Sequence, residues 1–391
     1  MRLVYIATDP ITAFRLMDGQ LAYMRSVGFD VTVITGPGPL LQRAAEREGV
    51  RAVAVPMRRA ISPAADVVAL LRLARELRRL RPTIVNAGTP KAGLLGVLAA
   101  RLVGVPVVVY LLRGLRFEGA RGPARLILAG VEHVTAAAAH RVFVNSNSLR
   151  ERFVGLGCAS SSKTWVPGSG SSNGVNADLF APNAERRAWA GEERRRLGIP
   201  ADAIVVGFVG RFVVDKGLSE LVTAFRQAAA EEPRLRLLLV GDDDATDPIS
   251  AELRRHITED PHIVTTGFVE EPAAYYALMD VFAFPSYREG FPNAVLEAAA
   301  AGLPTVAFRA TGTVDAVVDG ETGTLIAQGD EAALAAAVLR YARAPQLRRQ
   351  HGDAAQARVE RRFRREVVWQ ALADEYRRLA RAANVEPNVE G

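Results

Sequence analysis

Short apolar runs alternate, in the first half of the chain, with stretches in which apolar residues recur every three or four positions. The short runs are typical of buried β-strands, and the longer stretches are typical of amphipathic helices. Strands are predicted at residues 3–7, 31–35, 51–55, 83–86, 107–111 and 141–145. Helices are predicted between them, including 14–27, 64–80 and 123–139. This alternation predicts a parallel sheet with helices on both faces.

The second half of the chain begins the same alternation again. Short buried strands are predicted at residues 203–209, 235–240, 262–265, 281–284, 305–308 and 324–326. The fold class is therefore α/β, with two doubly wound, Rossmann-like parallel-sheet domains in tandem. Such domains bind ligands at the carboxyl ends of their strands, and two facing domains are expected to place a cleft between them.

A polar segment marks the expected junction between the two halves. Residues 160–182 are rich in Ser, Gly and Asn, a composition typical of a linker. We therefore expect an N-terminal domain over residues 1–182 and a C-terminal domain over residues 183–365. The tail from 345 to 383 is helical and rich in arginine, and its last part, residues 366–391, is expected to pack back across the domains.

One apolar stretch, residues 92–112, is long enough to span a membrane. It contains glycines, an arginine and a proline, however, and it becomes β-branched after Pro106. A buried helix, a turn at Gly104 and a buried strand account for it better than a membrane span. The N-terminal residues 1–10 have too short an apolar run for a signal peptide and are predicted to contain a buried strand.

Composition narrows the class of protein. The chain has 391 residues, of which 49% are hydrophobic and 24% charged, as in a soluble protein of two domains. Cys158 is the single cysteine, so no internal disulfide forms and a cytoplasmic location is the default expectation. The net charge of +6 suits an acidic ligand, a nucleic acid or an anionic membrane surface. Nucleic acid is the weakest of these, because no zinc-finger spacing, RNA-binding aromatic signature or basic tail is present.

The first candidate site follows the predicted strand 203–209. Gly210 allows the backbone to turn, and Arg211 and Lys216 then flank the start of a helix. Backbone N–H groups, the helix dipole and both cations would attract an anion, and a diphosphate fits best. The segment lacks the Gly-Lys-Ser/Thr of a P-loop. The alternative is an ordinary loop with solvated charges.

The second candidate site follows the predicted strand 281–284. Glu289 and Gly290 lie in a loop, a helix begins near Phe291, and Glu297 lies in an otherwise apolar stretch of that helix. A carboxylate there needs a partner, and a ribose diol with two hydroxyl donors would serve. Glu289 is placed to bind sugar hydroxyls. The alternatives are an exposed loop carboxylate for Glu289 and a narrow solvent-facing stripe for Glu297.

A third candidate follows the predicted strand 305–308. In the sequence Thr-Gly-Thr, Gly312 and Thr313 can bring backbone amides close to a phosphate. This short segment is weak evidence when it is taken alone.

Together these motifs resemble glycosyltransferase family 4, the retaining transferases of the GT-B fold. The motifs are Gly-Arg-x4-Lys-Gly, Glu-x7-Glu within Glu-Gly-Phe-Pro-Asn-Ala-x-Leu-Glu-Ala, Ala-x-Gly-Leu-Pro-x-Val and Val-x-Asp-Gly-Glu-Thr-Gly. The resemblance implies a catalytic set of Arg211, Lys216 and Glu289, with the two cations on the donor diphosphate. It also implies a nucleotide-sugar donor bound by Gly210, Phe268, Val269, Gly290, Phe291, Glu297, Gly312 and Thr313.

The N-terminal half resembles a narrower branch of that family, which builds capsules, exopolysaccharides and lipid-linked glycans. The similarity lies in residues 86–96, 113–118 and 168–176. It implies a UDP-sugar donor, often an N-acetylhexosamine, and a polyprenyl-diphosphate-linked saccharide as acceptor. Arg113-Gly114 stands where many members have His-Gly, so no catalytic histidine is assigned. Lys91, Arg113 and Arg116 are the candidates on the acceptor side.

The resemblance also implies a mechanism without a metal or other cofactor. The leaving diphosphate would be stabilised by cations and helix N-termini and would itself take the acceptor proton. The run Asp242–Asp244 is expected to be a solvated loop, and the five histidines show no ligand spacing. The arginine-rich helix 64–80 is most simply a solvated face, but it would also suit an anionic bilayer at the inner face of the plasma membrane.

Two other functions remain open at this point. A nucleotide-sugar hydrolase or epimerase of the same fold would need no acceptor, and a catalytically dead scaffold subunit would need no donor chemistry. The intact charged residues of the motifs count against the scaffold. A dinucleotide-dependent dehydrogenase is excluded, because no Gly-x-Gly-x-x-Gly opens a helix after the first strand.

Overall fold

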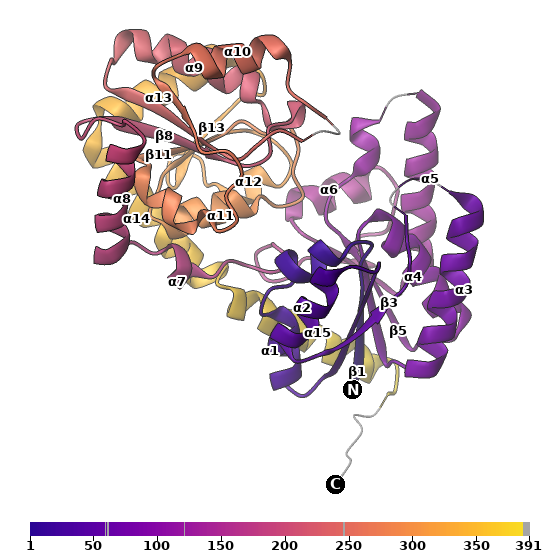
Figure 1. Ribbon diagram of the computed structural model, residues 1–391. Coiled ribbons are helices and arrows are strands. Elements are labelled where there is room, and N and C mark those ends of the chain that lie inside the picture. Colours follow the sequence, from indigo (N-terminus) through magenta and orange to yellow (C-terminus); the bar gives the residue numbers. More distant parts are fainter. Residues whose placement is uncertain (59, 61, 121, 245–246, 386–391) are drawn as a thin grey trace. The chain divides into compact units, whose positions relative to one another are not determined.

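The computed structural model describes residues 1–58, 60, 62–120, 122–244 and 247–385, with only the backbone of Arg116 (Figure 1). Its contacts divide the chain into two compact units. One comprises Met1–Gly174 together with Arg365–Gly391, and the other comprises Val175–Arg364. The chain therefore leaves the first unit eight residues before the expected boundary at 182, and it returns to that unit for its last helix.

The first unit is built on a seven-stranded parallel sheet with the order β3-β2-β1-β4-β5-β6-β7. The six predicted strands are confirmed within two residues at each end. The two-residue β7 is not visible in the hydrophobic pattern because it is too short to show an alternation. The strands are β1 (Arg2–Ile6), β2 (Asp30–Thr35), β3 (Arg51–Ala54), β4 (Ile84–Gly88), β5 (Val107–Leu112), β6 (Arg141–Val144) and β7 (Thr164–Trp165).

Helices cover both faces of this sheet (Figure 1). The predicted helix 14–27 is wrong as one element, because the chain breaks it at Gly19, where φ is 74°. A Cβ atom at that position would lie 2.7 Å from the ring of Trp369. The helices are η1 (Thr12–Leu16), α1 (Gln20–Ser26), α2 (Pro39–Glu48), α3 (Pro63–Leu80), α4 (Pro90–Leu102), η2 (Arg116–Gly119), α5 (Gly122–Ala138), α6 (Asn147–Gly155) and α15 (Arg365–Ala382).

The apolar stretch 92–112 folds as helix α4, a turn at Gly104 and the buried strand β5, as expected from its glycines and proline. Of the described helices, none is both long and apolar enough to cross a membrane.

The C-terminal helix α15 completes the core of the first unit. Trp369 and Tyr376 are buried with residues of β1 and β2 in one hydrophobic cluster. The ring of Tyr376 stacks on Phe143 of β6 with the centroids 5.6 Å apart, and its hydroxyl is hydrogen-bonded to the side chain of Asn86. The end of the chain is therefore part of the N-terminal fold.

The second unit has a six-stranded parallel sheet with the order β10-β9-β8-β11-β12-β13 and an apolar cluster on each face. All six predicted strands are confirmed. They are β8 (Ile204–Val209), β9 (Leu235–Val240), β10 (Ile263–Thr265), β11 (Val281–Phe284), β12 (Thr305–Phe308) and β13 (Gly323–Ile326). The helices are α7 (Ala177–Phe180), α8 (Ala184–Arg196), η3 (Val214–Lys216), α9 (Leu218–Glu231), α10 (Ala251–Glu259), η4 (Pro272–Leu278), α11 (Asn293–Ala300), α12 (Thr313–Ala316), α13 (Glu331–Arg343) and α14 (Pro345–Arg362).

Candidate functional site

The strand order of the second sheet places β8 and β11 side by side at its centre, although more than seventy residues separate them. β9 lies on the other side of β8, and β12 lies on the other side of β11. The direction of winding therefore reverses between β8 and β11. Ligands of doubly wound folds bind at the carboxyl ends of the strands at such a reversal, so the loops after β8 and β11 form the candidate site.

An ion pair between Lys216 and Glu289 joins these two loops. The Nζ atom of Lys216 lies 2.5 Å from Oε1 of Glu289. The hydroxyl of Ser286 donates a hydrogen bond to the same oxygen at 2.8 Å. The ammonium also lies 5.2 Å from the ring centroid of Phe284. Because both charged side chains are largely buried, their interaction is less screened by water than that of a surface pair.

The backbone holds the two loops in close contact around this pair. Gly217 has a φ of 67°, and a Cβ atom there would lie 2.1 Å from the carbonyl oxygen of Pro285. The N–H of Tyr287 donates to the carbonyl of Asp215 at 3.0 Å. The side chain of Arg288 forms an ion pair with the carboxylate of Asp215. Glycine is therefore required at 217, and the position of Lys216 is fixed from both loops.

A third loop, after β12, contacts the loop that carries Glu289. Gly312 has a φ of 77°, and a Cβ atom there would lie 2.7 Å from the carbonyl oxygen of Gly290. The N–H of Glu289 donates to the carbonyl of Thr311 at 3.2 Å. Thr313 begins α12 and is fully buried, and in the described part of the chain its Oγ1 has no hydrogen-bond partner. The sequence-predicted residues Glu289, Gly290, Gly312 and Thr313 are thus brought together.

A pocket of about 430 Å³ opens at the ends of β8 and β9. Gly210, Arg211, Phe268 and Val269 are among the residues that line it. The side chain of Phe268 is 71% exposed, although phenylalanine is usually buried. An exposed aromatic face at the edge of a pocket offers a surface on which a planar ring can stack.

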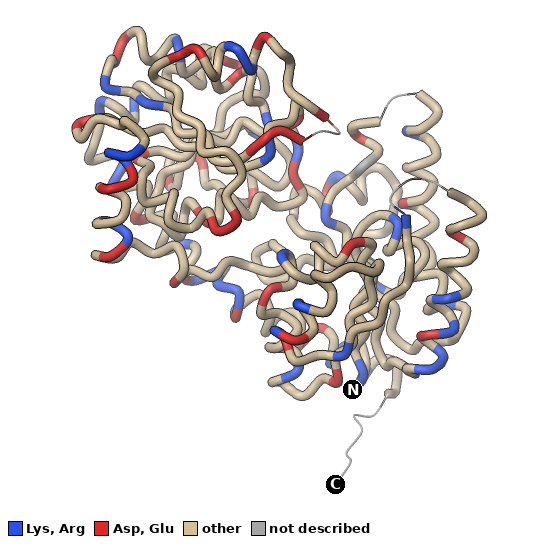
Figure 2. Tube along the Cα trace, viewed as in Figure 1, with Lys and Arg blue, Asp and Glu red and all other residues tan. Residues whose placement is uncertain are grey.

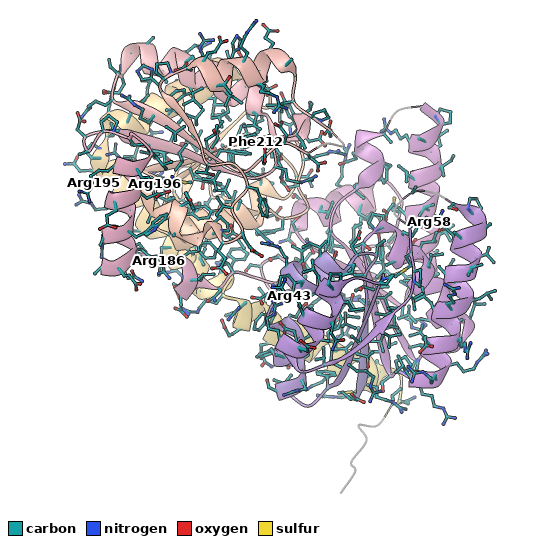
Figure 3. The ribbon with its side chains drawn as sticks, viewed as in Figure 1. Arg43, Arg58, Arg186, Arg195, Arg196 and Phe212 are labelled. Carbon is teal, nitrogen blue, oxygen red and sulfur yellow. The ribbon has the colours of Figure 1, made fainter. Side chains whose placement is uncertain are left out.

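Two aspartates that line the same pocket form ion pairs with arginines. Arg211 forms an ion pair with Asp244, and Asp243 forms one with Arg254. Phe212, next to Arg211, is buried in the apolar cluster instead and packs on Phe208 with the centroids 6.4 Å apart. Figure 3 labels the position of Phe212 in the second unit. Across the described ranges, no group of three or more His, Cys, Asp and Glu side chains is placed to hold a metal ion.

Glu297 has a partner within the protein that the sequence did not reveal. Its Oε2 accepts a hydrogen bond of 2.7 Å from the hydroxyl of Tyr276. Burial raises the pKa of Glu297, and the hydrogen bond from Tyr276 opposes that rise. Tyr276 lies in η4, twenty-one residues before Glu297, so no local spacing indicated this contact. Phe291 is buried as well, and its ring packs against Phe363 at 5.3 Å, so its side chain belongs to the core.

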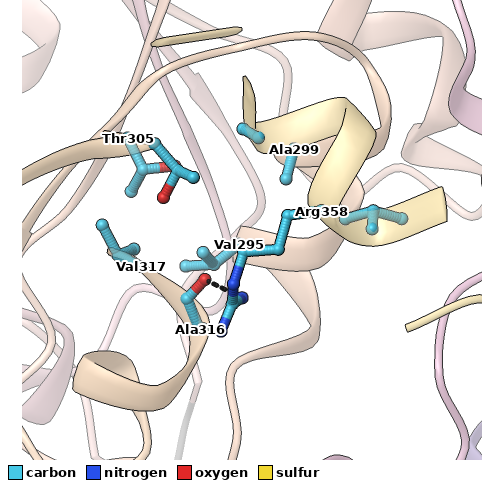
Figure 4. A pocket seen from close by; sticks show the side chains of 9 residues that line it. Val295, Ala299, Thr305, Ala316, Val317 and Arg358 are labelled. Atoms are coloured by element: carbon cyan, nitrogen blue, oxygen red, sulfur yellow. Dashed lines mark hydrogen bonds between the residues drawn. The ribbon is translucent and has the colours of Figure 1, made fainter. Parts of the chain in front are cut away.

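Helix α14 contacts α12, the short helix that follows the loop after β12, through the side chain of Arg358. The guanidinium of Arg358 donates to the carbonyl oxygens of Asp315 and Ala316 at 2.7 and 2.9 Å (Figure 4). These hydrogen bonds satisfy backbone carbonyl oxygens at the end of α12. Arg358 also lines a cavity of about 10 Å³, which has room for about one water molecule. This cavity is too small for a substrate. Arg358 therefore acts by positioning α12 and, with it, Gly312.

The three acceptor-side candidates lie in the first unit, and they differ in the partners of their charged side chains. Lys91 forms an ion pair with Asp66 at 2.7 Å, so its charge is already balanced. Arg113 follows β5, and burial lowers its pKa to about 10. Its Nε is buried and has no hydrogen-bond partner in the described part of the chain. Arg116 lies in η2, and its side chain is outside the described residues.

Two family models match the chain. The model described as "Glycosyl transferase 4-like domain" matches residues 17–167, and the model described as "Glycosyl transferases group 1" matches residues 203–343. The first span includes β2 to β7 of the first sheet and leaves out β1, and the second includes all six strands of the second sheet and the residues of the candidate site.

Named relatives extend this similarity over most of the chain. The capsular polysaccharide biosynthesis glycosyltransferase CapM of Staphylococcus aureus is 32% identical over 92% of this chain and 93% of its own length. A GDP-mannose-dependent α-mannosyltransferase of Mycobacterium tuberculosis is 31% identical, with 79% and 78% covered. The UDP-Gal:α-D-GlcNAc-diphosphoundecaprenol α-1,3-galactosyltransferase of Escherichia coli is 28% identical, with 77% of each chain covered.

A solved structure shows the same two-domain fold. HepE of Anabaena, determined in complex with UDP and glucose, superposes with a TM-score of 0.80 over 97% of this chain and 100% of its own, at 21% identity. The two parallel sheets thus match the GT-B architecture. The two family models and the relative that is 32% identical over 92% of this chain show that the chain is a glycosyltransferase and belongs to glycosyltransferase family 4.

Proposed function

We propose that the protein transfers a sugar from a UDP-sugar to a polyprenyl-diphosphate-linked saccharide in bacterial surface polysaccharide assembly, with retention of the anomeric configuration. The sugar would be an N-acetylhexosamine or a related hexose. The observation that carries this proposal is the Lys216–Glu289 pair at the reversal point of the second sheet. The proposal assigns the cation to the leaving diphosphate and the neighbouring carboxylate to the sugar hydroxyls.

The donor would extend across the three loops of the second unit. Its base would enter the pocket beside the exposed ring of Phe268. Arg211, Lys216 and the N–H groups at the start of α12 would bind the diphosphate. Glu297, whose Oε2 is oriented by Tyr276, would accept hydrogen bonds from the ribose.

The reaction breaks the bond between the anomeric carbon and the oxygen of the donor phosphate. Negative charge then builds on the departing diphosphate, and the cations and backbone N–H groups around it stabilise that charge without a metal. The acceptor hydroxyl forms the new bond on the face that the leaving group vacates. Its proton passes to the departing phosphate oxygen, so the step needs no base from the protein.

Two features support a lipid-linked acceptor. Relatives of this chain include one enzyme of capsule synthesis and one that acts on a diphosphoundecaprenol-linked sugar. In addition, Arg113 is a partly buried cation at the carboxyl edge of the first sheet, with a buried Nε, and no ion pair with a carboxylate balances it among the described residues. An acceptor diphosphate would supply the missing negative charge. The enzyme would then work as a peripheral protein at the inner face of the plasma membrane, where such acceptors are anchored.

A thermal-shift panel tests the donor assignment. UDP, GDP, ADP and UDP-N-acetylhexosamines are compared on the wild type, on Lys216→Ala and on the control Lys163→Ala, whose lysine lies in the other unit. A ligand at about 100 times its Kd stabilises the folded state by about 2.7 kcal/mol, a visible shift. We expect a shift with UDP compounds that is lost only in Lys216→Ala.

Other outcomes would contradict parts of the proposal. A shift with GDP alone would favour a GDP-sugar donor, as in the mannosyltransferase relative. Release of free sugar without an acceptor, at the rate of full turnover, would favour a hydrolase. Absence of a shift with every nucleotide would favour a scaffold.

A further inference from the structure

Helix α5 exposes an apolar segment that the reaction does not use. Every residue from 122 to 127 is exposed, and Arg125 carries the single charge of this segment. The side chains of Leu126 and Ile127 are 77% and 57% exposed. The exposed stripe continues along the helix through Gly130 and Val134, where the exposed His133 is its one polar neighbour. A soluble helix would normally place polar residues on such a face.

Helix α3 has a related pattern on its own solvent-facing side. Its first half exposes Val67, Val68 and Leu71, of which Leu71 is 62% exposed. Its second half exposes the arginines Arg72, Arg75, Arg78 and Arg79. Figure 2 shows this change along α3, with basic residues toward its C-terminal end and few charges toward its start. Arg79 pairs with Glu76, whereas no ion pair is found for the other three among the described residues.

The two apolar segments lie at the same edge of the sheet. Helices that connect parallel strands run opposite to them, so each helix starts at the edge where the strands end. Helix α4 packs against both α3 and α5, so the three helices start on the same edge of the sheet, and Figure 1 shows the start of α5 extending beyond the start of α3. Arg113, at the end of β5, lies at this edge too. The apolar segments and the proposed site of the acceptor diphosphate are therefore on the same edge of the first sheet.

We propose that this surface docks the first unit on an anionic lipid bilayer. The exposed apolar residues at the starts of α5 and α3 insert into the interface between headgroups and acyl chains. Arg125 and the two α3 arginines nearest to its apolar half, Arg72 and Arg75, contact anionic headgroups. Exposed apolar side chains next to unpaired cations are the pattern of a membrane-surface helix, and they match a bilayer in both polarity and charge. Only the placement of the acceptor rests on the proposed function; the binding of lipid does not.

Co-sedimentation with vesicles tests the docking surface. The full-length protein is mixed with vesicles of phosphatidylglycerol and phosphatidylcholine, or of phosphatidylcholine alone, at low and high salt. The variant Leu126→Glu/Ile127→Glu removes the inserted side chains. Leu102→Glu is the matched control, because Leu102 is 65% exposed but lies at the other end of α4. Since all three leucine and isoleucine side chains are exposed, these variants should fold, and thermal unfolding verifies that they do.

We expect the wild type and Leu102→Glu to bind anionic vesicles and the double variant to bind at least about tenfold more weakly. Arg72→Gln/Arg75→Gln should weaken binding by roughly fivefold for each charge, and only with anionic vesicles. The transfer rate is then compared on an acceptor in vesicles and on a short-chain soluble acceptor. The double variant should lose activity on the first and keep it on the second.

Two results would overturn the proposal. The first is equal vesicle binding by the wild type and the double variant. The second is a wild type that ignores vesicles but forms a dimer that the double variant disrupts, because the surface would then be an interface between two copies. Vesicle binding without any sugar transfer would leave this inference standing and would contradict the proposed function instead.

Discussion

Glu132 is a buried carboxylate of α5, and Glu132→Gln should make the protein more stable at neutral and alkaline pH. The side chain is 3% exposed, and its Oε2 accepts a hydrogen bond of 2.7 Å from the hydroxyl of Tyr110. Burial raises the pKa of Glu132 to about 7, and the hydrogen bond from Tyr110 opposes that rise. Glutamine keeps the shape and can accept the same hydrogen bond, but it brings no charge into the core.

The size of the effect follows from the two pKa values. The folded protein holds the proton up to about pH 7, whereas an ordinary glutamate loses it near 4.5. Because the pKa is raised on folding, stability falls as the pH rises between these values, and the full loss is present above pH 7. Each pKa unit is worth about 1.4 kcal/mol, so the difference between the two pKa values lowers the free energy of unfolding above pH 7 by about 3 kcal/mol.

Thermal unfolding of the wild type and Glu132→Gln between pH 5 and pH 8.5 measures this difference. The two should melt within a few degrees of each other at pH 5, and the variant should melt on the order of 5–10 °C higher above pH 7. Glu151→Gln, which changes an exposed glutamate of α6, should show no such dependence on pH. If Glu132→Gln gains nothing at pH 8 relative to pH 5, the carboxylate is not charged and buried as the reasoning requires.

Three further outcomes concern the site itself. Lys216→Ala should reduce the rate of transfer roughly 100- to 1000-fold, because it removes a cation from the leaving group, and near-normal turnover would exclude this role. Transfer should continue at an unchanged rate in EDTA, since no step is assigned to a metal, and complete loss would contradict that assignment. Gly312→Ala should lower both the melting temperature and the affinity for the UDP-sugar, because its Cβ atom would lie 2.7 Å from the carbonyl oxygen of Gly290. Gly320→Ala is the control: its φ of 74° is similar, but no atom lies within 4 Å of the added Cβ, so an equal effect of both variants would show that only backbone strain matters.

The sheets could be predicted from the sequence because each central strand is a short apolar run between turn signals. The failures arise where distant residues determine the local structure. The break at Gly19 depends on the ring of Trp369, which is 350 residues away in the chain. The tail 366–391 was expected to pack back across the domains, but the partners of α15, which include residues of β1, could not be read from the sequence. Periodicity shows that a helix has an apolar face, but it does not show which core that face enters.

The candidate site could be predicted at the level of loops but not of partners. Lys216 and Glu289 each stood in a motif that suggested a ligand, whereas their contact with each other depends on β8 and β11 being neighbours. Lys91 was predicted from the sequence as a candidate for the acceptor side. In the structure its ammonium forms an ion pair with Asp66, a partner that the sequence did not indicate. A charged residue in a motif therefore becomes informative only when its neutralising partner is known.

The pairing of Lys216 with Glu289 has a consequence for recognition of the donor. In the protein alone, Oε1 of Glu289 takes hydrogen bonds from the ammonium and from Ser286. Under the proposed function, a diphosphate draws the ammonium away, and a largely buried carboxylate then needs a new donor. Sugar hydroxyls provide it, but a nucleotide without a sugar does not. The same ion pair that orients Lys216 thus couples binding of the phosphates to the presence of the sugar, and this coupling favours the intact donor over the spent nucleotide after transfer.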